Sequence, residues 1–150
     1  PITGLLPDSV LGAFNPDALS FQSDVREIVF QSLRETLGAQ FTEKEGERLV
    51  AASFNPLLSE EKNIARLQRL YTKTVEAKDA KERAFEYFSK NRTLKGYIPE
   101  NTDFDSMINA VVQESDLEDL TDDQITTLYE NGSEPERKII LEFVRKRDQK

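Results

Sequence analysis

Cysteine, histidine and tryptophan are absent from this chain of 150 residues. Without cysteine, disulfides and thiol chemistry are excluded, and the redox compartment stays open. Without histidine, the chain cannot by itself form a Ser-His-Asp triad, a Cys-His pair or a histidine-ligated zinc or iron site. The Gly-rich phosphate-binding motifs GxGxxG and GxxxxGK[ST] are missing as well. Carboxylates, Lys, Tyr, Ser and Thr remain, and they are too common here to indicate a reaction.

One metal-like spacing occurs in the chain. Asn101, Asp103 and Asp105 mimic the first three ligands of a calcium loop. The sixth position is then Ser106 and the twelfth is Val112, where such a loop needs Gly and Glu. We therefore interpret these residues as helix caps, and we expect no metal, no cofactor and no enzymatic activity.

Long apolar runs are also missing. No run approaches 18 apolar residues, so no transmembrane segment is predicted. Apolar residues make up 37% of the chain and charged residues 32%. This composition favours a single helical domain with much solvated surface over a thick sandwich.

No strand pattern appears, and apolar residues recur at helical spacing through most of the chain. Three capping boxes, in which a Thr or Ser is followed three residues later by Glu or Gln, mark helix starts at Thr42, Thr121 and Ser133. We predict an all-α bundle of about six helices, over about 24–37, 43–53, 60–90 and 106–114, from Thr121 to Gly132, and from Ser133 onward. The long central helix over about 60–90 carries an apolar stripe that Phe85 and Phe88 continue.

The chain divides by composition into three parts. Residues 1–19 form an extended apolar arm, residues 20–98 a helical core, and residues 99–150 an acidic C-terminal helical subdomain. The arm contains three of the six prolines and a set of large apolar residues that need a surface to cover them. We predict a protein interface there, formed by Ile2, Leu5, Leu6, Val10, Leu11 and Phe14. The alternative is that the arm folds back on its own bundle.

Charge is distributed unevenly along the chain. Residues 1–40 carry two bases and five acids, residues 41–98 twelve bases and nine acids, and residues 99–150 six bases and fourteen acids. A net charge of −8 gives no counterion release on a phosphate backbone, so we expect no direct contact with DNA. The acidic cluster over 116–123 is more typical of a solvated linker than of a site. It could also meet a basic partner, such as the middle of a second copy.

Several motifs follow one another in a fixed order between Phe14 and Tyr97. They read FNP, then LG-x-x-[FL]-[TS]-x-x-EG-x-x-L, then FNP-x-LS-x-x-x-N before the long helix, and finally TLKGY. In this chain they correspond to Phe14-Asn15-Pro16, Leu37-Gly38, Phe41-Thr42, Glu45-Gly46, Leu49, Phe54-Asn55-Pro56, Leu58-Ser59, Asn63 and Thr93 to Tyr97.

This order resembles a helical region of tailed-bacteriophage virion proteins of the DNA-transfer, ejection or internal-virion type. The resemblance covers somewhat more than half of the chain. It implies a structural protein of the particle, present in the virion and in the host cytoplasm during assembly. The implied partners are further copies of the chain and portal, tail or ejection proteins. No catalytic residues are implied. The motif residues with expected structural roles are Gly38, Phe41, Thr42, Glu45, Gly46, Asn55, Pro56, Ser59 and Gly96.

Two other classes of function stay open at this point. One is a soluble adaptor or regulatory module that binds another protein through the N-terminal arm. The other is an enzyme that uses carboxylates, such as a cell-wall hydrolase, for which Glu45 is the one candidate. Capping already explains Glu45, and close helix packing would explain Gly46, so we expect both residues to be structural.

Overall fold

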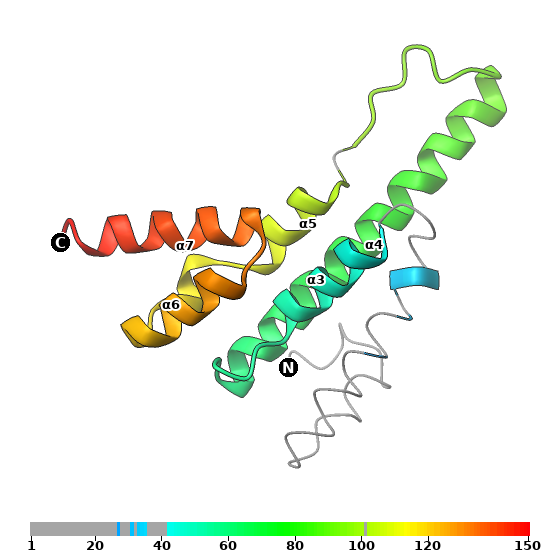
Figure 1. Cartoon of the computed structure of the whole chain (residues 1–150). Coiled ribbons are helices and arrows are strands. Elements are labelled where there is room, and N and C mark those ends of the chain that lie inside the picture. The colour runs from blue at the N-terminus through cyan, green and yellow to red at the C-terminus, as the bar shows by residue number, and fades with distance from the viewer. Residues whose placement is uncertain (1–26, 28–30, 32, 36–41, 101) are drawn as a thin grey trace.

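The computed structural model describes residues 27, 31, 33–35, 42–100 and 102–150, and the following refers to these (Figure 1). The elements are α3 (Glu43–Ser53), α4 (Glu60–Asn91), α5 (Phe104–Val111), the 3-10 helix η3 (Glu114–Leu117), α6 (Asp122–Asn131) and α7 (Glu134–Arg147). No described residue lies in a strand. The predicted all-α class and the long helix are therefore confirmed. The arm over 1–19 and most of the predicted helix 24–37 lie outside the described residues.

All three predicted capping boxes form. The Thr42 hydroxyl accepts from the Glu45 N–H at 3.2 Å, and the Glu45 carboxylate accepts from the Thr42 N–H at 2.8 Å. Thr121 and Gln124 form the same pair of bonds at the start of α6. At the start of α7 the Glu136 carboxylate accepts from the Ser133 N–H at 2.7 Å and from the Ser133 hydroxyl at 2.8 Å. Because each box connects residues only three apart, the sequence alone is enough to place these helix starts.

The fourth predicted helix, 106–114, is displaced. Asp103 caps α5, because its carboxylate accepts from the Ser106 N–H at 2.8 Å, and the helix therefore begins at Phe104. At the other end, Val112 has extended backbone angles and closes α5. Glu114 consequently belongs to η3. The capping interpretation of Asp103 is confirmed.

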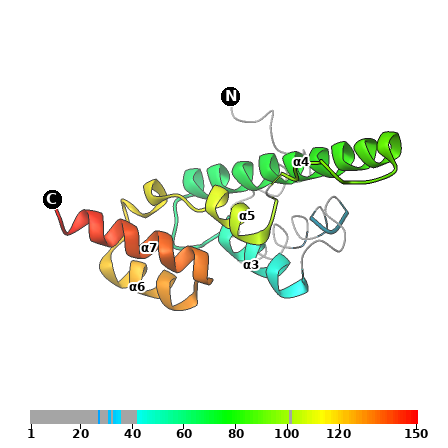
Figure 2. The same cartoon turned by 90° about the horizontal axis from the view of Figure 1, so that it is seen from above.

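The main core forms where α3 and α5 pack on the first half of α4 (Figures 1 and 2). Leu49 and Val50 of α3, Leu67 of α4 and Ile108 of α5 are almost fully buried there. Leu33, one of the few described residues before α3, packs into the same cluster. At about 1.5 Å per residue, the 32 residues of α4 extend about 48 Å, well beyond the two shorter helices that cover it.

A second, smaller core lies between η3, α6 and α7. Leu117, Ile125 and Ile140 are its buried residues. The neighbouring residue of α7, Ile139, packs against the main core instead. Helix α7 thus contacts both cores and joins the C-terminal elements to the rest of the fold.

Candidate functional site

The turn between α3 and α4 explains the FNP-x-LS-x-x-x-N motif. The buried side chain of Asn63 accepts from the Asn55 N–H at 2.8 Å and donates to the Asn55 carbonyl oxygen at 2.9 Å and the Leu58 carbonyl oxygen at 3.3 Å. Ser59 caps α4 by accepting from the Lys62 N–H. One amide therefore holds the backbone of the whole turn, which includes Pro56, and the motif is a structural device.

The TLKGY motif forms a second turn, at the far end of α4. Gly96 has φ +87°, in the left-handed region that L side chains rarely adopt. The Tyr87 hydroxyl donates to the Lys95 carbonyl oxygen at 2.9 Å, and the Tyr87 and Tyr97 rings lie 5.2 Å apart. A Cβ on Gly96 would lie 3.2 Å from the Tyr87 hydroxyl oxygen. The chain that follows α4 is thereby fixed to the helix end.

The other predicted residues divide into two groups. Thr42 and Glu45 form the capping box of α3, which accounts for the Glu45 carboxylate, and Gly46 is buried within the same helix. Close packing at Gly46 stays a prediction. The remaining residues lie outside the described part of the chain: Gly38, Phe41 and all six arm residues, Ile2, Leu5, Leu6, Val10, Leu11 and Phe14.

A buried ionic cluster joins α4 to η3. Asp116 Oδ2 accepts from Arg66 Nε at 2.7 Å and from Arg69 Nη2 at 2.8 Å. The side chains of Arg66 and Asp116 are only 2% and 4% exposed. The remaining donors are also bonded, since Arg66 Nη1 donates to the Ala52 carbonyl oxygen and Arg69 Nε to that of Val111. The two arginines therefore connect the Asp116 carboxylate of η3 to the backbone of α3 and α5.

This cluster corrects the interpretation of residues 116–123 as a solvated linker. Asp116 is the exception within that stretch, because it lies in the interior with two arginines. The helical register of Arg66 already contained a signal. Arg66 falls between Asn63 and Leu70 on the buried face of α4, so an arginine there requires a buried acceptor.

Burial and charge act in opposite directions on Arg66. Removal from water lowers the pKa of its guanidinium, and the carboxylate of Asp116 raises it again, so that the net pKa is below the usual value for arginine. Without its anion, a buried guanidinium would destabilise the fold, because nothing would offset the free energy of removing it from water. The role of the cluster is therefore structural, and no buried side-chain nitrogen or oxygen among the described residues lacks a hydrogen-bond partner.

The second half of α4 presents an apolar face that no other element of the described part of the chain covers. Leu67 and Leu70 are each 2% exposed, beneath α3 and α5. Phe85 and Phe88 follow them at a separation of 18 residues, which is about five complete helical turns, and therefore lie on the same stripe. Phe85 is nevertheless 71% exposed and Phe88 46% exposed. The stripe continues past the point where the covering helices end.

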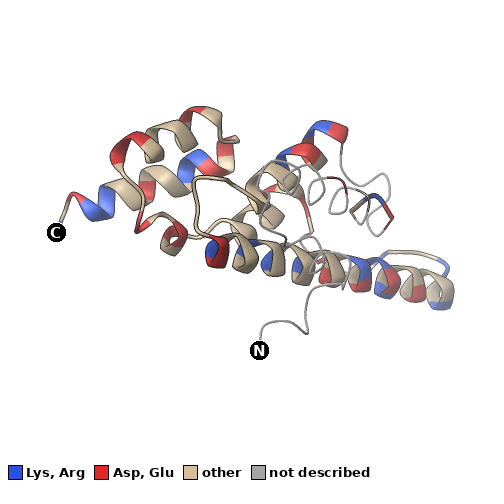
Figure 3. Cartoon of the chain, turned by 90° about the horizontal axis from the view of Figure 1, so that it is seen from below, with Lys and Arg blue, Asp and Glu red and all other residues tan. Residues whose placement is uncertain are grey.

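We call residues 85–99, which contain this face and the turn after it, the tip. The tip carries three bases, Lys90, Arg92 and Lys95, and one acid, Glu86. Leu94 and Ile98 add to its exposed apolar surface. Figure 3 shows the basic positions at the far end of α4, away from the acidic C-terminal elements. The tip thus combines large exposed apolar side chains with a net positive charge.

An ion pair anchors the segment that leaves the tip. Arg83 donates from Nε and Nη2 to the two carboxylate oxygens of Glu100, at 2.8 and 2.9 Å. This bidentate hydrogen bond lowers the pKa of Glu100 and raises that of Arg83. The pair is exposed, so it orients the loop after α4 rather than stabilising the core.

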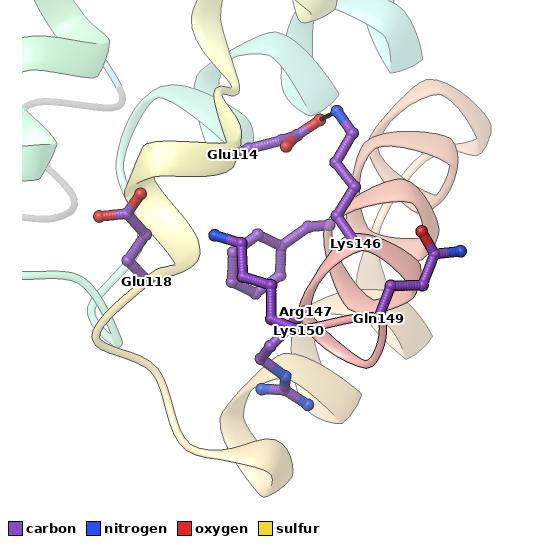
Figure 4. Close-up of a pocket in the computed structure, with 7 residues that line it drawn as sticks. Glu114, Glu118, Lys146, Arg147, Gln149 and Lys150 are labelled. Atoms are coloured by element: carbon purple, nitrogen blue, oxygen red, sulfur yellow. Dashed lines mark hydrogen bonds and ion pairs between the residues drawn. The ribbon is translucent and has the colours of Figure 1, made fainter.

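A shallow pocket of about 630 Å³ lies between η3 and the C-terminal end of α7 (Figure 4). Glu114 and Lys146 face each other across it at 2.8 Å. The hydrogen bond to Glu114, and a second one to Glu142, raise the pKa of Lys146. Two acids, Glu114 and Glu118, line one side of the pocket and three bases, Lys146, Arg147 and Lys150, line the other, so the pocket has no strong field of one sign to attract a ligand.

In comparisons with known proteins, no protein-family model, no curated protein and no solved structure matches this chain. Among the described residues, no helix combines the length and the apolar character needed to cross a bilayer. Over the same residues, no group of three or more acidic, Cys or His side chains is arranged to hold a metal ion. The candidate functional surface is the tip of α4, because its exposed apolar side chains lie beside a net positive charge.

Proposed function

We propose that this chain is a structural component of a tailed-bacteriophage particle, present in several copies and linked to genome delivery or to the head–tail region. The observation that carries the proposal is the uncovered stripe of α4. Two phenylalanines on the continuation of a core face mark a surface that another protein covers. A scaffold that presents such a surface binds proteins, and the proposal assigns the chain no catalytic step and no cofactor.

The rigid framework around the tip supports this role. The described residues of the phage-like motifs are caps and turns, from the Thr42 box to the turn at Gly96. The buried amide of Asn63 and the Arg66–Asp116 pair fix the first half of α4. A helix held so firmly at one end projects its other end at a defined position, as assembly in a particle requires.

The proposed partners follow from the same resemblance. They are further copies of the chain together with portal, tail or ejection proteins, and direct contact with DNA is not part of the proposal. The chain would be found in the virion, and in the host cytoplasm during assembly.

Mass spectrometry of purified particles tests the proposal. We expect peptides of this chain in gradient-purified virions, at a constant ratio to a capsid protein through successive purification steps. An adaptor or regulatory protein would instead remain in the lysate and be lost from the particles at the first gradient. That outcome would contradict the structural role.

A further inference from the structure

We infer that the tip of one copy docks on the acidic end of a second copy, so that the chain assembles head to tail. This inference rests on the proposed function and gives it a specific contact. The acidic end comprises residues 114–136, which run from η3 through α6 to the start of α7.

The acidic end carries nine carboxylates and not one Lys or Arg over its 23 residues. Some of these carboxylates are neutralised inside the molecule, as Asp116 is by its two arginines. Three exposed ones, Glu118, Asp123 and Glu130, form no ion pair within the described part of the chain. They leave a negative surface available to an outside partner.

The tip is the complementary surface. Lys90, Arg92 and Lys95 are exposed, and none of them pairs with an acid among the residues that the structure describes. Apolar area is present on both sides of the proposed contact, from Phe85 and Phe88 at the tip and from Tyr129 at the acidic end. Interfaces of this kind gain affinity from the apolar centre and orientation from the charges around it.

One molecule cannot bring its own two surfaces together. The acidic end is attached to the beginning of α4, where Lys62 Nζ pairs with Asp119 at 2.9 Å. Phe88 lies 26 residues further along the same helix, which is about 39 Å at about 1.5 Å per residue. Figures 1 and 2 both show the far end of α4 and the α6–α7 region at opposite ends of the molecule. At about 0.1 M salt the screening length is only about 10 Å, so the two charged surfaces do not neutralise each other.

The contact must therefore be made between molecules, and its two sides are different surfaces. An interface of this heterologous type closes into a ring or continues as a filament, depending on the rotation between neighbours. A symmetric contact of tip with tip would instead bring Lys90, Arg92 and Lys95 of both copies together. Repulsion between like charges disfavours that arrangement.

A charge-swap experiment on the full chain tests the inference. The tip variant carries Lys90→Glu, Arg92→Glu and Lys95→Glu, and the acidic-end variant carries Glu118→Lys, Asp123→Lys and Glu130→Lys. Sedimentation velocity at millimolar protein concentration and low salt should show assemblies of the unmodified chain that dissociate at about 1 M salt, where the screening length is about 3 Å. Each variant alone should sediment as a monomer. An equimolar mixture should assemble again, because the reversed tip then fits the reversed end.

Helix α3 provides the control. Lys44→Glu with Arg48→Glu reverses two exposed charges that belong to neither surface, and this variant should assemble as the unmodified chain does. Circular dichroism of every variant should match the unmodified chain, which separates loss of contact from loss of fold.

Three results overturn the inference. The first is a chain that stays monomeric at millimolar concentration and low salt. The second is an acidic-end variant that still assembles alone, as a symmetric tip contact would allow. The third is a mixture of the two variants that fails to assemble. The proposed function survives any of these results if the chain is found in purified particles. If the charge swap succeeds but the chain is absent from particles, only the proposed function is refuted.

Discussion

Replacement of Asp116 by Asn tests the buried ionic cluster, because it removes the one carboxylate that both arginines bond. Asn keeps the shape and one oxygen acceptor, so the change removes mainly the charge. Arg66, with a side chain only 2% exposed, would then be a buried cation without an anion. Removal of one partner from a buried pair costs about 3–5 kcal/mol. For a domain of this length, that loss lowers the thermal midpoint by about 6–20 °C, at about 2–4 °C per kcal/mol.

Asp119→Asn is the matched control. Asp119 belongs to the same acidic stretch and also pairs with a base of α4, Lys62, but its side chain is 85% exposed. Exposed pairs contribute about 0–1 kcal/mol, so the control should unfold at nearly the temperature of the unmodified chain. Urea unfolding followed by circular dichroism measures both variants on one scale.

A double-mutant cycle then isolates the pair itself. Arg66→Met combined with Asp116→Asn removes both charges, and its loss of stability should be smaller than the sum of the two single losses. If Asp116→Asn and Asp119→Asn are instead equally mild, within about 1 kcal/mol of each other, water reaches the cluster and the reasoning from burial is refuted.

Four further outcomes are expected. Asn63→Ala should lower the free energy of unfolding by about 1–3 kcal/mol in urea titrations, because the backbone groups of the α3–α4 turn lose their partner; an unchanged midpoint would mean that the turn holds without the amide. Gly96→Ala should cost about 1–2 kcal/mol, since its φ is positive, and hydrogen exchange should speed up locally rather than throughout the protein; uniform exchange would contradict this. The lowered pKa of Glu100 means that its bond to Arg83 contributes above about pH 4.5 and is lost as the pH falls through the lower folded value. NMR signals of the loop after α4 should therefore shift in acid, and Arg83→Gln should move the midpoint of that shift to higher pH; an unchanged midpoint would contradict this. Deletion of residues 1–19 should leave the helicity and thermal midpoint unchanged but weaken binding to partners if the arm serves assembly; earlier melting with unchanged association would place the arm in the core.

Local signals explain why much of the fold could be predicted. The Thr42 and Thr121 boxes, and the bounds of α3 and α4, depend on residues three or four apart. The predicted start at residue 106 lies two residues after the observed start at Phe104, because apolar spacing marks the buried face of α5 but the Asp103 cap fixes its first residue.

The buried ionic cluster and the exposed stripe of α4 both depend on contacts between residues that are distant in sequence, and these contacts could not be predicted. Asp116 lies 50 residues from Arg66, and nothing near either residue identifies the other. Likewise, the sequence places Phe85 and Phe88 on the apolar stripe but does not show where the covering helices end. On the tip side that limit is set by the start of α5 at Phe104, where Asp103 caps the helix, since α5 runs back along α4 toward Arg69.

Ile139 and Ile140 of α7 are consecutive residues, yet one packs on the main core and the other on the second core. Successive side chains on a helix are about 100° apart, so α7 makes a hydrophobic contact on each of two faces. Any roll of the helix that improves one contact moves the other out of register. The orientation of α7 is therefore constrained by both cores, and a substitution that rotates the helix to repack one core should also disturb the other.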